Sequence, residues 1–167
     1  MKEHLKLAWR WIAMAAYETL REETEGAVLC WLATVSAEGV PNVSPKEMFC
    51  LHGSNALAIA DIASPVSVRN IRGNPHVCVS YMDIFRQRGF KLVGKARIIS
   101  PQDSDFDTYA APLVEKACGA FKIRHIILVN VERISRIRAP SYIFYPDRSE
   151  DMMMASAYDQ YGVKPIR

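Results

Sequence analysis

The sequence lacks the cysteine pairs and histidine clusters on which metal and redox sites are built. Its four cysteines lie far apart in apolar segments, at Cys30, Cys50, Cys78 and Cys118. Isolated thiols of this kind are typical of reduced, buried side chains rather than of a disulfide, a zinc site or a redox dithiol. The four histidines are equally scattered, at His4, His52, His76 and His125. None stands at ligand spacing from a cysteine or a carboxylate, and we therefore expect no metal.

Strong net charge and long hydrophobic runs are also missing. The 21 lysines and arginines barely outnumber the 18 acidic residues, and no basic run stands out, which argues against a nucleic-acid-binding protein. No apolar stretch approaches the length of a membrane span. The N-terminus superficially resembles a signal peptide, but Glu3 and Glu18 interrupt its apolar region. We expect a cytoplasmic protein.

No repeat, low-complexity segment or linker composition divides the chain, and 50% of its 167 residues are hydrophobic. This combination predicts a single domain with a substantial core. Within residues 1–167 we expect an N-terminal amphipathic helix at 1–25, a β-domain with short helices at 27–145 and a tail at 146–167. The tail carries three consecutive methionines, and we expect packing on a partner to order it in part.

Short apolar segments joined by turns predict strands that pair as hairpins. Residues 27–35 form a continuous apolar run, 36–39 form a turn that ends in glycine, and 40–51 form the return strand. Pro41 and Pro45 would break a long ladder of backbone hydrogen bonds. We therefore expect the return strand to be bent or to lie at a sheet edge.

The second half of the chain continues this pattern. Strands are expected at residues 90–99 and 121–137, with a helix over 100–119 that Pro112 should split. Gly94 marks a bulge or a close approach of two backbones. About six or seven strands, connected mainly as hairpins, favour an antiparallel β-barrel with peripheral helices over a doubly wound sheet.

The stretch from residue 55 to 81 organises the rest of the chain. A short strand ends at Asp61, and Ser64 followed by Pro65 signals a helix start. The serine hydroxyl can cap free backbone amides, and proline has no amide to leave unpaired. The Gly-Asn-Pro sequence at 73–75 ends this helix before the next strand begins.

The N-terminus of this short helix is a candidate anion site. Free amides and a partial positive charge at a helix N-terminus attract phosphate. Ser64 and Ser67 add hydroxyl groups there, and Arg69 adds a full charge. Ser44 and Lys46 share one face of the return strand at 40–51, by the two-residue period. The alternative interpretation is a capped surface helix with a solvated arginine.

Three segments together resemble one known family. They read LATVSAEGVPNVSPKEMFCL (32–51), ALAIADIASPVSVRNIRGNPHVCVSY (56–81) and FKLVGKARII (90–99). Their order and spacing are similar to those of the pyridoxamine 5'-phosphate oxidase-like family of FMN-binding split barrels. The resemblance covers well over half of the chain, and the N-terminal helix and the tail lie outside it.

This resemblance implies a split β-barrel that forms a homodimer, with FMN in grooves at the dimer interface. The positions that match the family's phosphate-binding residues are Ser44, Lys46, Ser64, Ser67, Arg69 and Asn70. Asn70 can equally be read as a helix-end residue. The backbone of Ala60, Asp61 and Ile62 would run along the isoalloxazine ring. Gln87 and Arg88, at a strand entry, would reach the flavin of the other subunit.

Two departures from the family count against authentic pyridoxamine 5'-phosphate oxidase. The C-terminal region of that enzyme carries an arginine and a histidine close together, but here no histidine follows His125. The family's flavin-contacting glutamine at the strand entry corresponds to Gly89. These departures leave FMN binding intact as a hypothesis and leave the substrate open.

Several functions remain compatible with the residues. We expect a flavin-dependent oxidoreductase that acts on an unknown small molecule, because the cofactor would carry the redox chemistry and no nucleophilic constellation stands out. The alternatives are a non-enzymatic flavin carrier or stress-response protein, or the same barrel with deazaflavin, haem or pyridoxal phosphate. A nucleic-acid-binding barrel would need aromatic residues interleaved with lysines on one strand face, and the segment 90–99 supplies them poorly.

Overall fold

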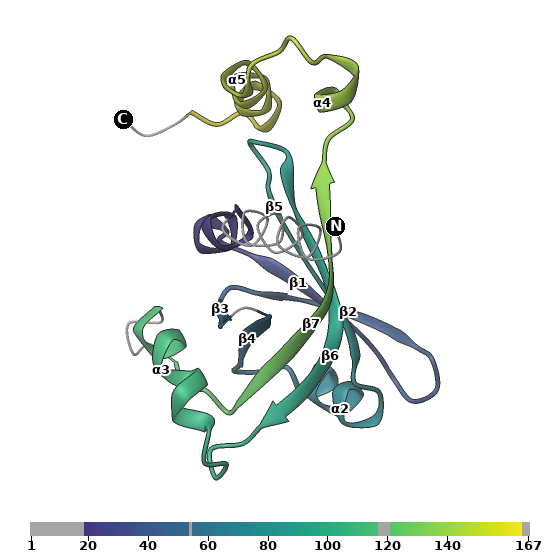
Figure 1. Ribbon diagram of the computed structural model, residues 1–167, viewed down its shortest axis with the longest axis vertical. Helices are drawn as coiled ribbons and strands as arrows, with labels where there is room; N and C mark the ends of the chain where they lie inside the picture. Colours follow the sequence, from purple (N-terminus) through teal and green to yellow (C-terminus); the bar gives the residue numbers. More distant parts are fainter. Residues whose placement is uncertain (1–18, 54, 117–120, 165–167) are drawn as a thin grey trace, which may run out of the picture.

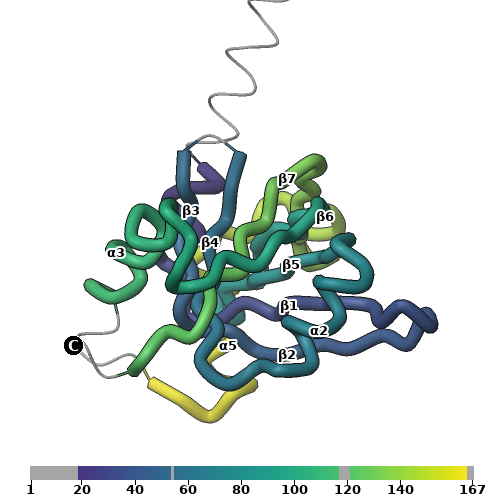
Figure 2. The backbone as a smooth tube through the Cα atoms, turned by 90° about the horizontal axis from the view of Figure 1, so that it is seen from below, coloured from purple at the N-terminus to yellow at the C-terminus, as the bar shows by residue number. Residues whose placement is uncertain are grey.

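The computed structural model describes residues 19–53, 55–116 and 121–164. The strands are β1 (Cys30–Val35), β2 (Pro41–Lys46), β3 (Phe49–His52), β4 (Ala56–Asp61), β5 (His76–Asp83), β6 (Arg88–Ile99) and β7 (His125–Arg138). They form one antiparallel sheet in the order β2-β1-β5-β6-β7-β4-β3. The sheet curls into a half-barrel with helices at its periphery (Figures 1 and 2), which confirms the predicted mainly-β split-barrel fold.

The N-terminal helix is described only in part. Residues 19–26 are helical, and the remainder of the helix predicted at the N-terminus lies outside the described residues. Leu20 is buried in the core, and Thr24 Oγ1 lies 2.6 Å from the hydroxyl oxygen of Tyr81 on β5. The end of this helix is therefore fixed to the sheet by both an apolar and a polar contact.

The return strand divides in two, as its prolines predicted. Pro41 and Pro45 lie in β2, which is an edge of the sheet, and residues 47–48 separate β2 from β3 at the opposite edge. Ala60 N–H donates to Met48 O over 2.9 Å, so β4 bonds to the link between the two edge strands. Proline is tolerated here because an edge strand need not donate every amide to a neighbour.

Residues 55–81 fold as a strand, a helix and a second strand. Helix α2 (Pro65–Gly73) follows β4 and packs beside β1 and β2 (Figure 2), and β5 begins at His76. One prediction is wrong: the Ser64 side chain does not cap α2. Its hydroxyl instead accepts a hydrogen bond from Lys46 Nζ, while its backbone N–H donates to Asp61 Oδ1 over 2.8 Å. The ammonium group of Lys46 thus occupies the Ser64 hydroxyl oxygen that was predicted to accept hydrogen bonds from the first amides of α2.

The two longest strands, β6 and β7, form the spine of the sheet. Their register shifts between Val93 and Gly94, which confirms the predicted irregularity. A Cβ atom at Gly94 would lie 2.0 Å from the carbonyl oxygen of Asn130. This position therefore requires glycine, because the two backbones approach too closely for any side chain.

Helix α3 (Phe106–Lys116) begins later than predicted. Asp103 Oδ2 accepts the backbone N–H of Ser100 over 2.7 Å, so the serine–proline signal produces a turn before the helix starts. Pro112 lies inside α3 and does not split it within 106–116. The fully buried Leu113 explains why packing against the sheet outweighs the missing amide. Residues 117–119 of the predicted helix are outside the described residues.

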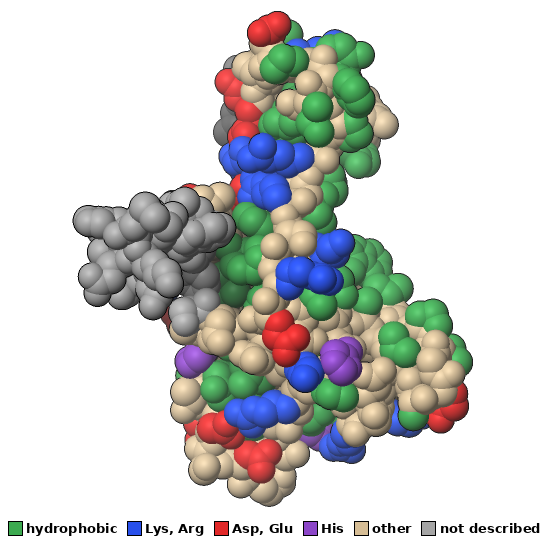
Figure 3. Space-filling view, turned by 45° about the vertical axis from the view of Figure 1, so that its right-hand side comes forward, with side chains coloured by type: hydrophobic (Ala, Val, Ile, Leu, Met, Phe, Trp, Pro, Cys, Tyr) green, Lys and Arg blue, Asp and Glu red, His purple; other side chains and the backbone are tan. Residues whose placement is uncertain are grey.

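The C-terminal segment forms two helices, α4 (Ser141–Phe144) and α5 (Glu150–Tyr161), beyond the end of β7 (Figure 1). Ser149 caps α5, and Gly162 ends it with a φ of 64°. Phe85 in the β5–β6 turn stacks on Tyr158, with ring centroids 4.7 Å apart. Hydrophobic side chains gather on the surface of this end (Figure 3), with Ile143 and Phe144 both more than 70% exposed.

The core lies on both faces of the central strands. Leu57 and Ile59 on one face of β4 join a cluster formed mainly by the strands, whereas Ala58 and Ala60 on the other face pack with α3. Cys30 is buried, as predicted, whereas Cys50 and Cys78 are only partly buried; Cys118 is outside the described residues. Among the described residues, no helix has the length and apolar character that crossing a membrane requires.

Candidate functional site

The inward face of β2 meets the first turns of α2. Burial alternates along β2, so Ser44 and Lys46 face the helix, as the two-residue period predicted. Ser44 Oγ lies 3.1 Å from Ser67 Oγ, and Lys46 Nζ donates to Ser64 Oγ. Two independent contacts therefore bring the predicted strand residues and the predicted helix residues into one polar cluster.

Lys46 is the electrostatic centre of this cluster. Its side chain is buried, with 7% of the residue exposed, and its hydrogen-bond partner is the neutral hydroxyl of Ser64. None of the ion pairs among the described residues includes Lys46. Burial lowers the pKa of Lys46, and the nearby Asp61 carboxylate only partly opposes this effect. A buried ammonium with a neutral partner strongly favours an added anion.

Asp61 is committed to contacts within the chain. It is buried at the end of β4, where Oδ1 accepts the Ser64 N–H and Oδ2 lies 2.9 Å from His125 Nδ1. The carboxylate therefore fixes both the start of α2 and the ring of His125. No sequence pattern indicated the role of His125, because it comes from β7, more than sixty residues along the chain.

Two pockets lie on either side of Ser64. The lysine pocket, of about 250 Å³, is lined by Lys46, Met48, Ala60, Ile62 and Ser64 among others. The arginine pocket, of about 430 Å³, is lined by Asp61, Ser64, Arg69, Arg72, Arg124 and His125, with apolar atoms of α2. Of the predicted cations, Lys46 lines the lysine pocket and Arg69 lines the arginine pocket. Ser64 belongs to both pockets.

Asn70 and Ser67 belong to a buried polar network that reaches β1. Asn70 is 4% exposed, and its Nδ2 donates to Thr34 Oγ1 over 3.2 Å. Asn42 Nδ2 also donates to Thr34 Oγ1, over 3.1 Å, and lies 3.5 Å from Ser67 Oγ. The sequence analysis did not single out Asn42 or Thr34, although Asn42 shares the inward face of β2 with Ser44. Asn70 therefore anchors α2 to the sheet.

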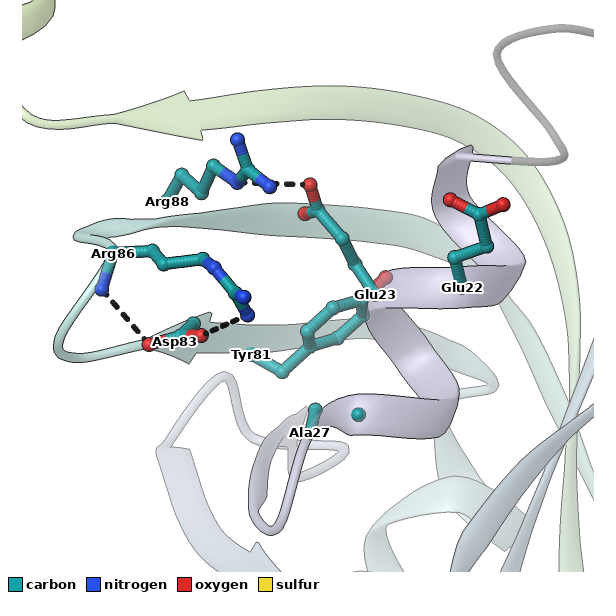
Figure 4. A pocket seen from close by; sticks show the side chains of 8 residues that line it. Glu22, Glu23, Ala27, Tyr81, Asp83, Arg86 and Arg88 are labelled. Atoms are coloured by element: carbon teal, nitrogen blue, oxygen red, sulfur yellow. Dashed lines mark hydrogen bonds and ion pairs between the residues drawn. The ribbon is translucent and has the colours of Figure 1, made fainter. Parts of the chain in front are cut away.

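Gln87 and Arg88 lie at the other end of β5 from α2. The eight residues of β5 separate the two ends by about 25 Å. Gln87 sits in the β5–β6 turn with a φ of 53°. Arg88 Nε lies 3.2 Å from Glu23 Oε1 in a pocket that Tyr81 and Arg86 also line (Figure 4). Within one chain these two residues do not join the cluster around Ser64.

Arg88 is part of an ion-pair network that connects three segments. Arg88 also pairs with Glu150 on α5, and Glu150 lies 2.9 Å from Arg86 Nε. Glu23 on the N-terminal helix receives two hydrogen bonds from Arg136 on β7, at 2.8 and 2.6 Å. The network holds the N-terminal helix, the β5–β6 turn and α5 together, which gives Arg88 a structural role in the single chain.

Solved structures with this fold include proteins named for FMN, for F420 and for haem. An FMN-binding protein from Syntrophomonas wolfei subsp. wolfei matches with a TM-score of 0.68 and 12% identity, over 83% of this chain and 98% of that one. An F420 reductase matches with a TM-score of 0.53 and 25% identity, over 71% and 95%. HutZ, the haem storage protein of Vibrio cholerae, matches with a TM-score of 0.54 and 18% identity, over 70% and 93%.

No curated protein matches the chain. The family model described as pyridoxamine 5'-phosphate oxidase matches residues 16–138, which include the whole sheet, α2 and α3. This match contains both faces of the polar cluster and excludes α4 and α5. The chain therefore belongs to the pyridoxamine 5'-phosphate oxidase family.

Proposed function

We propose that this protein binds FMN, with the phosphate held beside Ser64 between β2 and the start of α2. The observation that carries the proposal is the buried ammonium of Lys46, which has a neutral hydroxyl as its partner. A phosphate dianion would satisfy this charge and accept hydrogen bonds from the hydroxyls of Ser44 and Ser67. Arg69, exposed on the same helix, would add a second cation.

The lysine pocket fits the remainder of such a ligand. Its lining is mainly apolar, and Ala60 and Ile62 extend it from the end of β4. We place the isoalloxazine ring along the backbone of Ala60, Asp61 and Ile62. FMN would supply the redox chemistry when bound, and the chain would bind and orient it.

The complete cofactor site would require a homodimer. Gln87 and Arg88 lie far from Ser64 in the same chain, so they can contact the flavin only if a second copy presents them. The exposed apolar side chains of Val43 on β2 and Trp31 on β1 provide surface that a second chain could cover. In this assembly each flavin would lie between two subunits.

The proposed activity is a flavin-dependent oxidoreductase reaction on a small molecule that is not pyridoxamine 5'-phosphate. The last strand ends at Arg138, and α4 and α5 contain no histidine. Neither α4 nor α5 therefore supplies the C-terminal arginine–histidine pair of the authentic oxidase. A protein that binds flavin without turnover is the alternative, and oxidation or reduction of bound flavin by candidate substrates distinguishes the two.

A deazaflavin nucleotide is a second candidate ligand. The F420 reductase with this fold supports it, and the phosphate of such a cofactor would use the same cluster. Haem, suggested by the haem storage protein, would not use the Lys46 charge in this way. FMN remains the first choice, because its phosphate would pair with Lys46 and its ring would contact the apolar lining of the lysine pocket.

Replacement of Arg69 tests the phosphate assignment. We expect Arg69→Ala to weaken FMN binding by roughly 1.5–3 kcal/mol, the size of a charge-assisted hydrogen bond. Arg69 is exposed, so the variant should fold normally. Arg148→Ala is the matched control, because Arg148 is an exposed arginine that packs over Tyr145, outside both pockets. Equal FMN affinities for the two variants in a fluorescence titration would remove Arg69 from the site.

A further inference from the structure

The arginine pocket holds more positive charge than one phosphate requires. Arg69 and Arg72 stand three residues apart on α2 and therefore share a face of the helix. Arg124 reaches the same pocket from the residue before β7, where its backbone N–H donates to Asp61 O over 2.9 Å. Three arginines from two segments that are distant in sequence thus line one pocket.

These arginines keep their charge without an ion-pair partner among the described residues, and the exposed Glu38 interacts with Arg69 only at longer range. Among the ion pairs of the described residues, none includes Arg69, Arg72 or Arg124. Asp61 is the acidic residue that lines the pocket, but its two oxygens already bind the Ser64 N–H and His125. The pocket therefore carries a net positive charge of about two even with His125 neutral.

His125 adds a polar group that is already oriented. Because the buried Asp61 carboxylate accepts a hydrogen bond from Nδ1, the ring is fixed and Nε2 is left to other partners. No hydrogen bond from Nε2 to another described residue is present. A ligand in this pocket would meet an imidazole edge together with guanidinium groups, a combination that suits phosphate or carboxylate oxygens.

We infer that the arginine pocket binds a second anionic group, a phosphate or a carboxylate, next to the phosphate of the proposed flavin. This inference rests on the proposed function and extends it. A single FMN phosphate would engage Lys46 and Arg69, whereas Arg72 and Arg124 would keep their charge for a neighbouring anion. Two sources share this chemistry: the diphosphate of a flavin dinucleotide, or a separate anionic substrate.

Calorimetric titration with inorganic pyrophosphate tests the pocket directly. FMN-loaded protein should bind pyrophosphate at one site per chain, and Arg124→Ala and Arg72→Ala should each weaken this binding by about tenfold or more. Arg148→Ala should leave it unchanged. If pyrophosphate fails to bind, or if it binds equally well to all three variants, the inference is overturned.

A comparison of FAD with FMN identifies the source of the anion. If FAD binds at least tenfold more tightly than FMN, and Arg124→Ala removes this difference in affinity, the arginine pocket binds part of the cofactor. Pyrophosphate binding to FMN-loaded protein without an FAD advantage would assign it to a separate anionic ligand. If the protein binds no flavin, the proposed function fails, and pyrophosphate titration of the free protein with the same variants still decides the inference.

Discussion

At the scale of one residue, Lys46 carries a buried charge that lowers the stability of the free protein. Its ammonium is buried beside a hydroxyl, and burial lowers its pKa, so the charged form is destabilised in the free protein. The family resemblance and the two-residue period of β2 were enough to predict that Lys46 and Ser64 lie close together, as their hydrogen bond shows. The partnership of Asp61 with His125 was not predictable, because it depends on the pairing of β4 with β7.

We predict that Lys46→Met stabilises the free protein by roughly 0.5–2 kcal/mol while it weakens FMN binding. Methionine fills a similar volume without a charge that must be desolvated. The unfolded lysine binds its proton more tightly than the folded one, so the stabilisation should be largest at neutral pH and shrink as pH approaches 10.5, the ordinary pKa of lysine.

Urea unfolding of wild type and Lys46→Met at a series of pH values measures this effect. Lys91→Met provides the control, because Lys91 is exposed on β6 and bears no comparable burial cost. A variant that is less stable than wild type at neutral pH would show that the Lys46 ammonium contributes to folding rather than to binding.

Single glycines and caps decide the geometry of whole elements. Gly94 in the β6 strand was predicted as a bulge or a close approach, and it is both. Helix α5, by contrast, was missed, although Ser149, the acidic first turn and Gly162 are ordinary boundary signals. Its three methionines and mixed polarity show no clear apolar face, so periodicity gave no indication of a helix. Only the residues at its two ends indicated that this segment forms a helix.

We predict that Gly94→Ala destabilises the protein by about 2–3 kcal/mol, because the new methyl group would meet the Asn130 backbone at 2.0 Å. Gly26→Ala is the matched control, since no atom lies within 4 Å of its added Cβ. Denaturant midpoints for the two variants measure the difference. Equal midpoints would mean that β6 and β7 can separate at the bulge without cost.

At the scale of the whole molecule, two polar regions lie at opposite ends of the same sheet, too far apart within one chain to contact the same ligand. The polar cluster lies at the α2 end of β5, and the Arg88 ion-pair network lies at the other end. Hairpin spacing and the family resemblance were enough to predict the fold. The place of the tail was not predictable, because it depends on tertiary contacts of Glu150 with Arg86 and of Tyr158 with Phe85.

We predict a homodimer of the 18.8 kDa chain, because Gln87 and Arg88 can reach a flavin only from a second subunit. Analytical ultracentrifugation of the FMN-loaded protein should give about twice the mass of one chain. Introduction of a negative charge at an exposed apolar side chain of β1, Trp31→Glu, should weaken the dimer if β1 lies in the interface. A monomer that still binds FMN tightly would contradict the proposed shared groove.

The central claim is that a phosphate is recognised beside Ser64, and paired titrations of FMN and riboflavin measure it most directly. The two ligands share the isoalloxazine ring and differ in the phosphate that Lys46 and Arg69 are proposed to bind. We predict a yellow complex with FMN and at least a hundredfold weaker binding of riboflavin, as expected for two charge-assisted contacts. Equal affinities for the two ligands, or no binding of FMN, would contradict the account.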